Sequence, residues 1–259
     1  MIKPGLVSIT FRKLAPWAII SLVRQAGLAA IEWGGDIHVP HGNLQQAGMV
    51  GRMTRDAGLA IAAYGSYYRV GVSEQEGLDF DLVLETARAL GAPLIRVWAG
   101  NRPSAKADAD YRRSINGEAR RLAQKAAAAG LVLACEYHGG TLTDTRESAV
   151  QLFADIQHPA MRAYWQTPVG ASVEAGLESL RAMLPWLANA HVYHWDAAGK
   201  KRLPLSEGAE AWRRYLALIR STGRDHYALL EFVRDDSPKA FLEDARCLKS
   251  WLAAYHRRR

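Results

Sequence analysis

The sequence predicts a closed (β/α)8 barrel, an α/β fold, formed by a single domain over residues 1–259. One phrase recurs, in which a glycine ends an Ala- or Leu-rich helical run and a short apolar strand follows, as in "AGLAAIEW", "AGLAIAAY", "LGAPLIRVW" and "AGLVLACEY". Strands that are apolar at every position are typical of parallel sheets covered by helices. Eight such units follow one another without a linker, which favours a closed barrel over an open sheet.

The repeated glycines mark the ends of the predicted helices. Gly27, Gly58, Gly91 and Gly130 are expected just beyond helix ends, because glycine enters the left-handed conformation without a Cβ penalty. No GxGxxG turn follows the first strand, which argues against a dinucleotide-binding fold. The expected strands cover residues 6–9, 30–33, 60–64, 94–98, 132–136, 162–165, 190–194 and 227–231, with helices between them such as 111–129 and 205–221.

Composition and charge exclude several classes of protein. Hydrophobic residues make up 49% and charged residues 23%, which is ordinary for a globular chain and argues against disorder. The longest uncharged apolar stretch, "LAPWAIISLV", is shorter than the ~20 residues of a membrane helix, and no secretory leader is visible, so we expect a cytoplasmic protein without a membrane partner. The net charge of +7 invites nucleic acid as a partner, but the basic residues come in pairs on predicted helices, which is typical of solvated faces.

Polar side chains gather at the C-terminal ends of the predicted strands, where barrels of this kind carry their sites. Glu136, His191 and Glu231 belong to the fifth, seventh and eighth strands. Two carboxylates and an imidazole would bind a divalent cation such as Mn²⁺, Mg²⁺, Co²⁺ or Zn²⁺, and Gln166 after the sixth strand would complete the site with a neutral oxygen. The cation would polarise a substrate carbonyl, while Glu136 and Glu231 act as catalytic groups that remove and return a proton on the adjoining carbon.

Other residues near the strand ends are candidates for contact with the substrate. His138 lies two residues beyond Glu136 and is expected on the same side of the strand. The arginines have two interpretations, holding an anionic group or pairing with the glutamates, and the loop histidines could equally stabilise their own loops. His194 is also a rival of His191 as a metal ligand. The substrate-binding candidates are His38, His41, Arg69, Arg96, Trp98, His138 and His194, and an aromatic wall for a sugar ring is expected from Trp33, Trp98, Trp165 and Trp195.

The layout of these residues resembles the xylose isomerase-like TIM-barrel superfamily, in its sugar phosphate isomerase/epimerase branch, over essentially the whole chain. The resemblance rests on Glu136, a polar residue ending the sixth strand, "HVYHWD" on the seventh strand and Glu231. It implies a metal held by two Glu, one Asp and one His, with the two Glu as the acid/base pair acting through an enediolate. By position Glu136, Glu231 and His191 match this set. Gln166 stands where the relatives usually have Asp, which should weaken cation affinity and puts simple epimerase activity in doubt.

The resemblance implies a divalent-metal-dependent isomerase or epimerase acting on a sugar or polyol ketone. The alternative is a metal-dependent dehydratase or lyase that performs β-elimination on an oxidised sugar or glycoside, which the neutral Gln166 favours. An abasic-site endonuclease shares the superfamily's barrel, but the third strand ends without His and position 169 is Val, where its zinc ligands would be needed. A non-catalytic sugar-binding barrel is the remaining class, and an aromatic rim is compatible with a homodimer.

Overall fold

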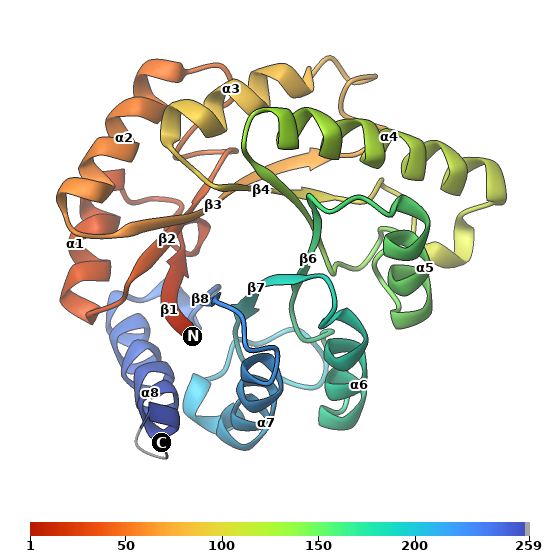
Figure 1. Ribbon diagram of the computed structural model, residues 1–259. Coiled ribbons are helices and arrows are strands. Elements are labelled where there is room, and N and C mark those ends of the chain that lie inside the picture. Colours follow the sequence, from red (N-terminus) through yellow and green to blue (C-terminus); the bar gives the residue numbers. More distant parts are fainter. Residues whose placement is uncertain (257–259) are drawn as a thin grey trace.

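The computed structural model describes residues 1–256 and shows a closed ring of parallel strands in the order β1 to β8 (Figure 1). The ring closes where β1 pairs with β8, from Ile2 opposite His226 to Leu6 opposite Leu230. The prediction of a (β/α)8 barrel is therefore confirmed. Residues 257–259 lie outside the described part, so a single domain over 1–259 stays a prediction.

An α-helix follows each strand, and Figure 1 shows the helices as an outer ring in which α8 comes to lie beside α1. The strands are β1 Ile2–Val7, β2 Ala30–Gly34, β3 Ala60–Arg69, β4 Leu94–Trp98, β5 Val132–Glu136, β6 Met161–Trp165, β7 Leu187–Val192 and β8 His226–Leu230. The α-helices are α1 Pro16–Ala26, α2 Leu44–Asp56, α3 Phe80–Leu90, α4 Ala109–Ala128, α5 Arg146–Ile156, α6 Val173–Met183, α7 Ala209–Arg220 and α8 Pro238–His256. Short 3-10 helices cover η1 Ser8–Phe11, η2 Ser104–Lys106, η3 Leu205–Gly208 and η4 Arg234–Asp236.

Two strands lie at least two residues earlier in the chain than predicted, and β8 lies one residue earlier. β1 begins at Ile2 and ends at Val7, where the chain turns into η1, whereas the apolar pattern placed this strand at 6–9. The strand predicted at 190–194 begins at Leu187 and ends at Val192. Lys3, Pro4 and Gly5 have low strand propensity, and pairing with β2 and β8 keeps this segment extended.

The four glycines that were expected beyond helix ends all adopt the left-handed conformation. Their φ angles are 64° at Gly27, 75° at Gly58, 81° at Gly91 and 74° at Gly130. At the ends of α1 and α3, the glycine N–H donates to carbonyl oxygens of the last helical turn. The repeated Gly signal in the sequence thus marks real helix ends.

The buried apolar side chains form two layers on either side of the barrel wall. The larger core lies between strands and helices and includes Leu6, Ile31 and Phe241. The smaller core fills the barrel interior and includes Val7, Leu94 and Leu229. No helix within residues 1–256 combines the length and apolarity that crossing a bilayer requires. The expected cytoplasmic location and homodimer stay predictions.

Replacing Gly5 with alanine should destabilise the barrel, because its new Cβ would lie 2.4 Å from Leu229 Cδ2 and 2.7 Å from the Ala30 carbonyl oxygen. Overpacking of this kind costs about 1–3 kcal/mol. Gly117→Ala is the matched control, since a Cβ there meets nothing on the surface of α4 and should stabilise the helix by about 0.5–1 kcal/mol. Urea unfolding of both variants checks the pair, and equal stabilities would contradict the packing argument.

Candidate active site

The C-terminal ends of the strands surround a cavity of about 210 Å³. Its walls come from β3, β4 and β5 and from the segments that follow β1, β6, β7 and β8. The cavity therefore lies at the barrel end where the sequence predicts a site. The lining residues are Ile9, Tyr67, Arg96, Trp98, Glu136, His138, Gln166, Val169, Tyr193, Trp195, Glu231 and Phe232.

A buried arginine joins two glutamates at the base of this cavity. Arg96 on β4 donates from Nε to Glu32 Oε1 on β2 at 2.7 Å, and its Nη1 forms an ion pair with Glu136 Oε2 on β5. The same carboxylates accept further hydrogen bonds, from Trp98 Nε1 to Glu136 Oε2 at 2.6 Å and from the Tyr164 hydroxyl to Glu32 Oε2 at 2.5 Å. Of the two interpretations of Arg96, the structure shows the pairing with glutamates.

His191 on β7 connects this ion pair to a third carboxylate. Its Nε2 lies 3.2 Å from Glu32 Oε2, and its Nδ1 lies 3.1 Å from Glu136 Oε1 and 3.4 Å from Glu231 Oε2. Glu231 follows the end of β8 directly, and its backbone N–H still donates to the Val192 carbonyl at 3.0 Å. The strand register thus places all three carboxylates around one imidazole.

Glu32 and Glu136 are held in their ionised form. Burial by itself would raise the pKa of each carboxyl, but the Arg96 guanidinium and the His191 imidazole outweigh that effect. The pKa of Glu32 falls to about 2, and the pKa of Glu136 falls well below its usual range. Two negative charges are therefore present inside the barrel at neutral pH.

The pKa of Glu231 is shifted in the opposite direction. Burial raises its pKa to about 7, with His191 opposing the rise and the nearby Glu136 charge adding to it. Burial would lower the pKa of His191, but the surrounding carboxylates, Glu231 first, raise it to about 10. The cluster thus accumulates negative charge that one arginine does not balance, and His191 carries a proton in compensation.

Three members of the cluster could hold a metal ion. One ligand atom from each of Glu136, His191 and Glu231 lies within 4.8 Å of the others. Two carboxylate oxygens and an imidazole nitrogen suit a divalent cation, which would replace the proton on His191 as the balancing positive charge. Gln166 lines the same cavity, and its role as a neutral fourth metal ligand stays a prediction. These residues fit a divalent cation. Their total negative charge is lower than it would be with an Asp at position 166.

His138 lines the cavity beside Glu136, as its spacing of two residues predicts. Its ring lies against Trp98, with ring centroids 4.8 Å apart, and its Nδ1 lies 2.7 Å from the Gly139 carbonyl oxygen. A carbonyl oxygen only accepts, so Nδ1 carries the hydrogen, and in the neutral ring Nε2 keeps a lone pair. His138 is therefore set up as a base outside the ion-paired cluster.

Glu32 and Tyr67 belong to the site although they were not among the site predictions. Glu32 interrupts an apolar strand in the same way as Glu136, so the sequence did contain a signal for it. Tyr67 lies in an irregular stretch of β3, with a φ of 57°, and its ring lies 5.1 Å from the Arg96 guanidinium. Its buried hydroxyl has no hydrogen-bond partner within residues 1–256. Strain and an unpaired hydroxyl beside a cavity are features of functional sites.

Four predicted substrate contacts lie outside the cavity lining and have other partners. The side chain of His38 contacts Ser8 Oγ at 3.0 Å, and that of His41 contacts the Tyr64 hydroxyl at 2.7 Å. The guanidinium of Arg69 lies 5.3 Å from the Trp98 ring centroid. His194 lines a neighbouring cavity and is packed against Gly208. Substrate contact by His38, His41, Arg69 and His194 stays a prediction.

The aromatic wall contains two of the four expected tryptophans. Trp98 and Trp195 line the cavity. The expectation for Trp33 and Trp165 is wrong, because both are fully buried between strand and helix, where their indole N–H groups donate at 3.1 Å to Thr54 on α2 and Ser179 on α6. Each directly neighbours an inward-facing residue, Glu32 or Tyr164, and adjacent residues of a strand point to opposite faces.

Arg96→Met should destabilise the protein by about 3–5 kcal/mol, because two buried carboxylates would lose their cation. Arg146→Met is the matched control, since Arg146 pairs with Glu147 and Glu178 on the exposed surface and its loss should change stability little. Urea unfolding of both variants measures the difference. Similar small losses in both would contradict a structural role for the buried pair.

Comparison with known proteins places this geometry in a family. A family model described as a xylose isomerase-like TIM barrel matches residues 20–251. A 3-dehydroshikimate dehydratase from Bacillus anthracis is 24% identical over 266 residues, covering 89% of this chain and 90% of the relative.

Solved structures agree on the fold. A probable 3-DHS dehydratase from Bacillus anthracis superposes with a TM-score of 0.79 at 20% identity, covering 95% of this chain and 98% of the other. D-psicose 3-epimerase from Clostridium cellulolyticum H10 superposes with a TM-score of 0.72 at 14% identity, covering 97% and 98%. Since the family model spans most of the sequence, the chain belongs to the xylose isomerase-like TIM barrel family.

Proposed function

We propose that the protein is a metal-dependent dehydratase or lyase that removes a β-oxygen substituent from a small hydroxylated cyclic ketone, such as an oxidised sugar or a compound related to 3-dehydroshikimate. The observation that carries this proposal is His138, a base in the cavity that is separate from the carboxylate cluster. The similarity to a 3-dehydroshikimate dehydratase supports the same reaction class.

The residues that would hold the cation are Glu136, His191 and Glu231, with Gln166 as a neutral donor. When bound, the cation would supply Lewis-acid polarisation of the substrate carbonyl, which acidifies the neighbouring C–H bond. Arg96 takes no part in binding it, because Glu32 and Glu136 occupy the guanidinium. Its role is to keep Glu136 ionised and oriented.

Proton transfer falls to His138. Its Nε2 lone pair accepts the proton from the carbon next to the carbonyl, the C–H electrons form the new C=C bond, and the β-carbon–oxygen bond breaks. The imidazolium then returns this proton to the departing oxygen, so a hydroxyl leaves as water and no other reactant is consumed. The unpaired Tyr67 hydroxyl offers a hydrogen bond to a substrate oxygen in the same cavity.

The shape of the cavity suits a flat ring. Trp98, Tyr193, Trp195 and Phe232 provide aromatic surface around a space of about 210 Å³. Planar apolar surface packs well against the face of a sugar or a cyclic ketone.

Epimerisation is the second candidate, and one observation favours it. Glu136 is ionised while the pKa of Glu231 is raised to about 7 by burial and by the neighbouring carboxylates, so one group can accept a proton while the other donates one. An epimerase needs such a pair on opposite faces of the substrate carbon. We prefer elimination because it uses His138 as the base. Epimerisation by Glu136 and Glu231 would give His138 no role.

Product mass distinguishes the two candidates. With 3-dehydroshikimate and a panel of keto-sugars as substrates, and Mn²⁺ added, mass spectrometry should detect a product lighter by one water. His138→Gln should lower kcat by about 10²–10⁴-fold while Mn²⁺ binding stays unchanged, because a glutamine can hydrogen-bond but cannot accept the proton. Glu136→Gln should lower both kcat and the affinity for Mn²⁺.

The opposite pattern would support the second candidate. Products of unchanged mass that take up deuterium from heavy water, together with an active His138→Gln variant, would overturn elimination. An enzyme that converts none of the ketones at saturating Mn²⁺ would argue against both.

Gln166→Asp should bind Mn²⁺ about tenfold more tightly than the wild type, because it adds an anionic oxygen to a cavity that already offers three ligand atoms. Gln151→Asp, on the exposed face of α5, adds the same charge away from the cavity and should leave affinity unchanged. Calorimetric titration with Mn²⁺ measures both, and equal affinities would remove Gln166 from the metal site.

A further inference from the structure

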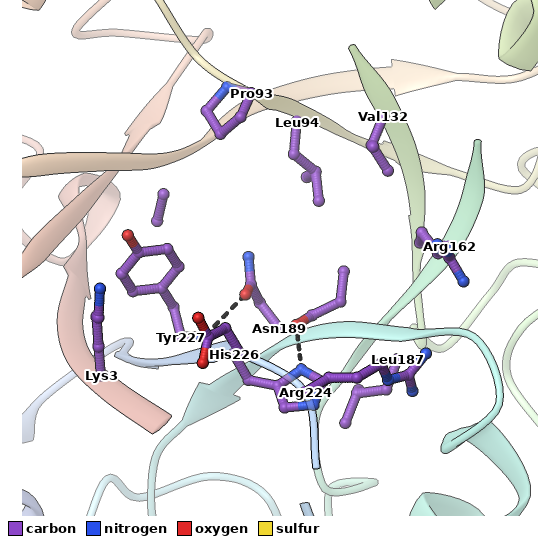
Figure 2. A pocket seen from close by; sticks show the side chains of 13 residues that line it. Lys3, Pro93, Leu94, Val132, Arg162, Leu187, Asn189, Arg224, His226 and Tyr227 are labelled. Carbon is purple, nitrogen blue, oxygen red and sulfur yellow. Dashed lines mark hydrogen bonds between the residues drawn. The ribbon is translucent and has the colours of Figure 1, made fainter. Parts of the chain in front are cut away.

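A second cavity, of about 360 Å³, lies at the opposite end of the barrel. It is surrounded by the first residues of the strands, including Lys3 on β1, Leu94 on β4, Val132 on β5 and Arg162 on β6 (Figure 2). Arg162 precedes Tyr164 by two residues, so the same face of β6 contributes to this cavity, to the barrel centre and, through Gln166, to the candidate active site. This volume is in the range of small-molecule pockets.

Positive charge collects at the mouth of this cavity. Lys3, Arg162 and Arg224 all belong to its lining, and Figure 2 shows Lys3 and Arg162 on opposite sides of it. Neither Lys3 nor Arg162 makes a hydrogen bond or a close ion pair with any residue in 1–256. Asp225 is the single carboxylate among the described lining residues, and it is bonded to the Met1 amino group at 2.5 Å.

The other polar groups of the lining do not neutralise this charge. Arg224 donates to the carbonyl oxygens of Leu184 and Pro185 after α6, which are neutral acceptors. His226 uses both ring nitrogens, Nδ1 with the Ala188 carbonyl at 2.6 Å and Nε2 with Thr222 Oγ1 at 2.7 Å. Asp225 faces Lys3 as well as the Met1 amino group, and its single charge leaves Arg162 and Arg224 as cationic donors without an acidic hydrogen-bond partner in residues 1–256.

An amide group and apolar walls complete the cavity. Asn189 is buried, its Oδ1 accepts from the Tyr227 backbone N–H at 2.8 Å, and its Nδ2 donates to the Tyr164 hydroxyl at 3.4 Å, which leaves one side-chain N–H for a ligand. Pro93, Leu94 and Val132 form an apolar wall on one side (Figure 2). Cationic donors at the rim and an apolar interior together select an anion that carries an apolar body.

We propose that this cavity at the N-terminal end of the barrel binds a small organic anion, with its phosphate or carboxylate beside Arg162 and Arg224 and its apolar body against Pro93, Leu94 and Val132. Charge-assisted hydrogen bonds from guanidinium groups provide the affinity for the oxyanion. The apolar wall provides the preference over inorganic ions, which would leave most of the volume filled with water. The site is independent of the proposed reaction at the other end of the barrel.

Calorimetric titration of the full chain with phenyl phosphate tests this site. We expect saturable binding of one molecule per chain, at least about tenfold tighter than inorganic phosphate, and no binding of phenol. Arg162→Gln should weaken phenyl phosphate about tenfold through loss of one charged donor, and Lys3→Gln should weaken it severalfold. Arg162→Lys, which keeps the charge, should retain most of the affinity. Benzoate in place of phenyl phosphate distinguishes a carboxylate ligand from a phosphate ligand.

Arg88→Gln, an exposed substitution in the last turn of α3, is the matched control and should bind phenyl phosphate like the wild type. Thermal unfolding of each variant separates lost binding from lost folding. Absence of saturable binding to phenyl phosphate and benzoate would overturn the proposal. Binding that survives unchanged in both Arg162→Gln and Lys3→Gln, or that inorganic phosphate matches in strength, would overturn it as well.

Discussion

The buried contact of Arg96 with Glu32 and Glu136 is the interaction on which the rest of the site depends. Removing three ionised groups from water is costly, and only close pairing with additional hydrogen bonds offsets that cost. Trp98 and Tyr164 provide those bonds. The two ion pairs bring side chains from β2, β4 and β5 together inside the barrel, and the guanidinium keeps both carboxylates ionised.

The same contact divides the tasks of the charged residues. One oxygen of Glu136 is occupied by Arg96 and Trp98, while the other faces His191. His191 in turn touches Glu32 on one side and Glu231 on the other. Burial and like charge raise the pKa of Glu231, so this carboxyl, which borders the cavity, binds a proton more readily than Glu32 or Glu136 does. Structural pairing and the proposed chemistry thus use different atoms of the same residues.

Polar groups also continue through the barrel toward its other end. The Tyr164 hydroxyl donates to Glu32 and lies 3.4 Å from the Asn189 side-chain nitrogen, which belongs to the lining of the N-terminal cavity. The barrel interior therefore contains hydrogen-bonded polar side chains as well as the apolar cluster that includes Val7, Leu94 and Leu229. In such a network, removing one side chain leaves its buried hydrogen-bond partners unpaired. The polar side chains of the interior therefore depend strongly on one another.

The sequence by itself determined the barrel, the helix ends at glycine and the cluster at the strand ends, because each depends on local periodicity: continuous apolar runs, left-handed glycines, and the i, i+2 rule that pairs Glu136 with His138. The tertiary structure alone decided that Arg96 pairs with Glu32, 64 residues away along the chain. It also decided that the loop residues His38 and His41 contact Ser8 and Tyr64. The early start of β1 was likewise decided by its neighbours β2 and β8. Contacts between distant residues depend on strand register and loop packing, and these are set only when the ring closes.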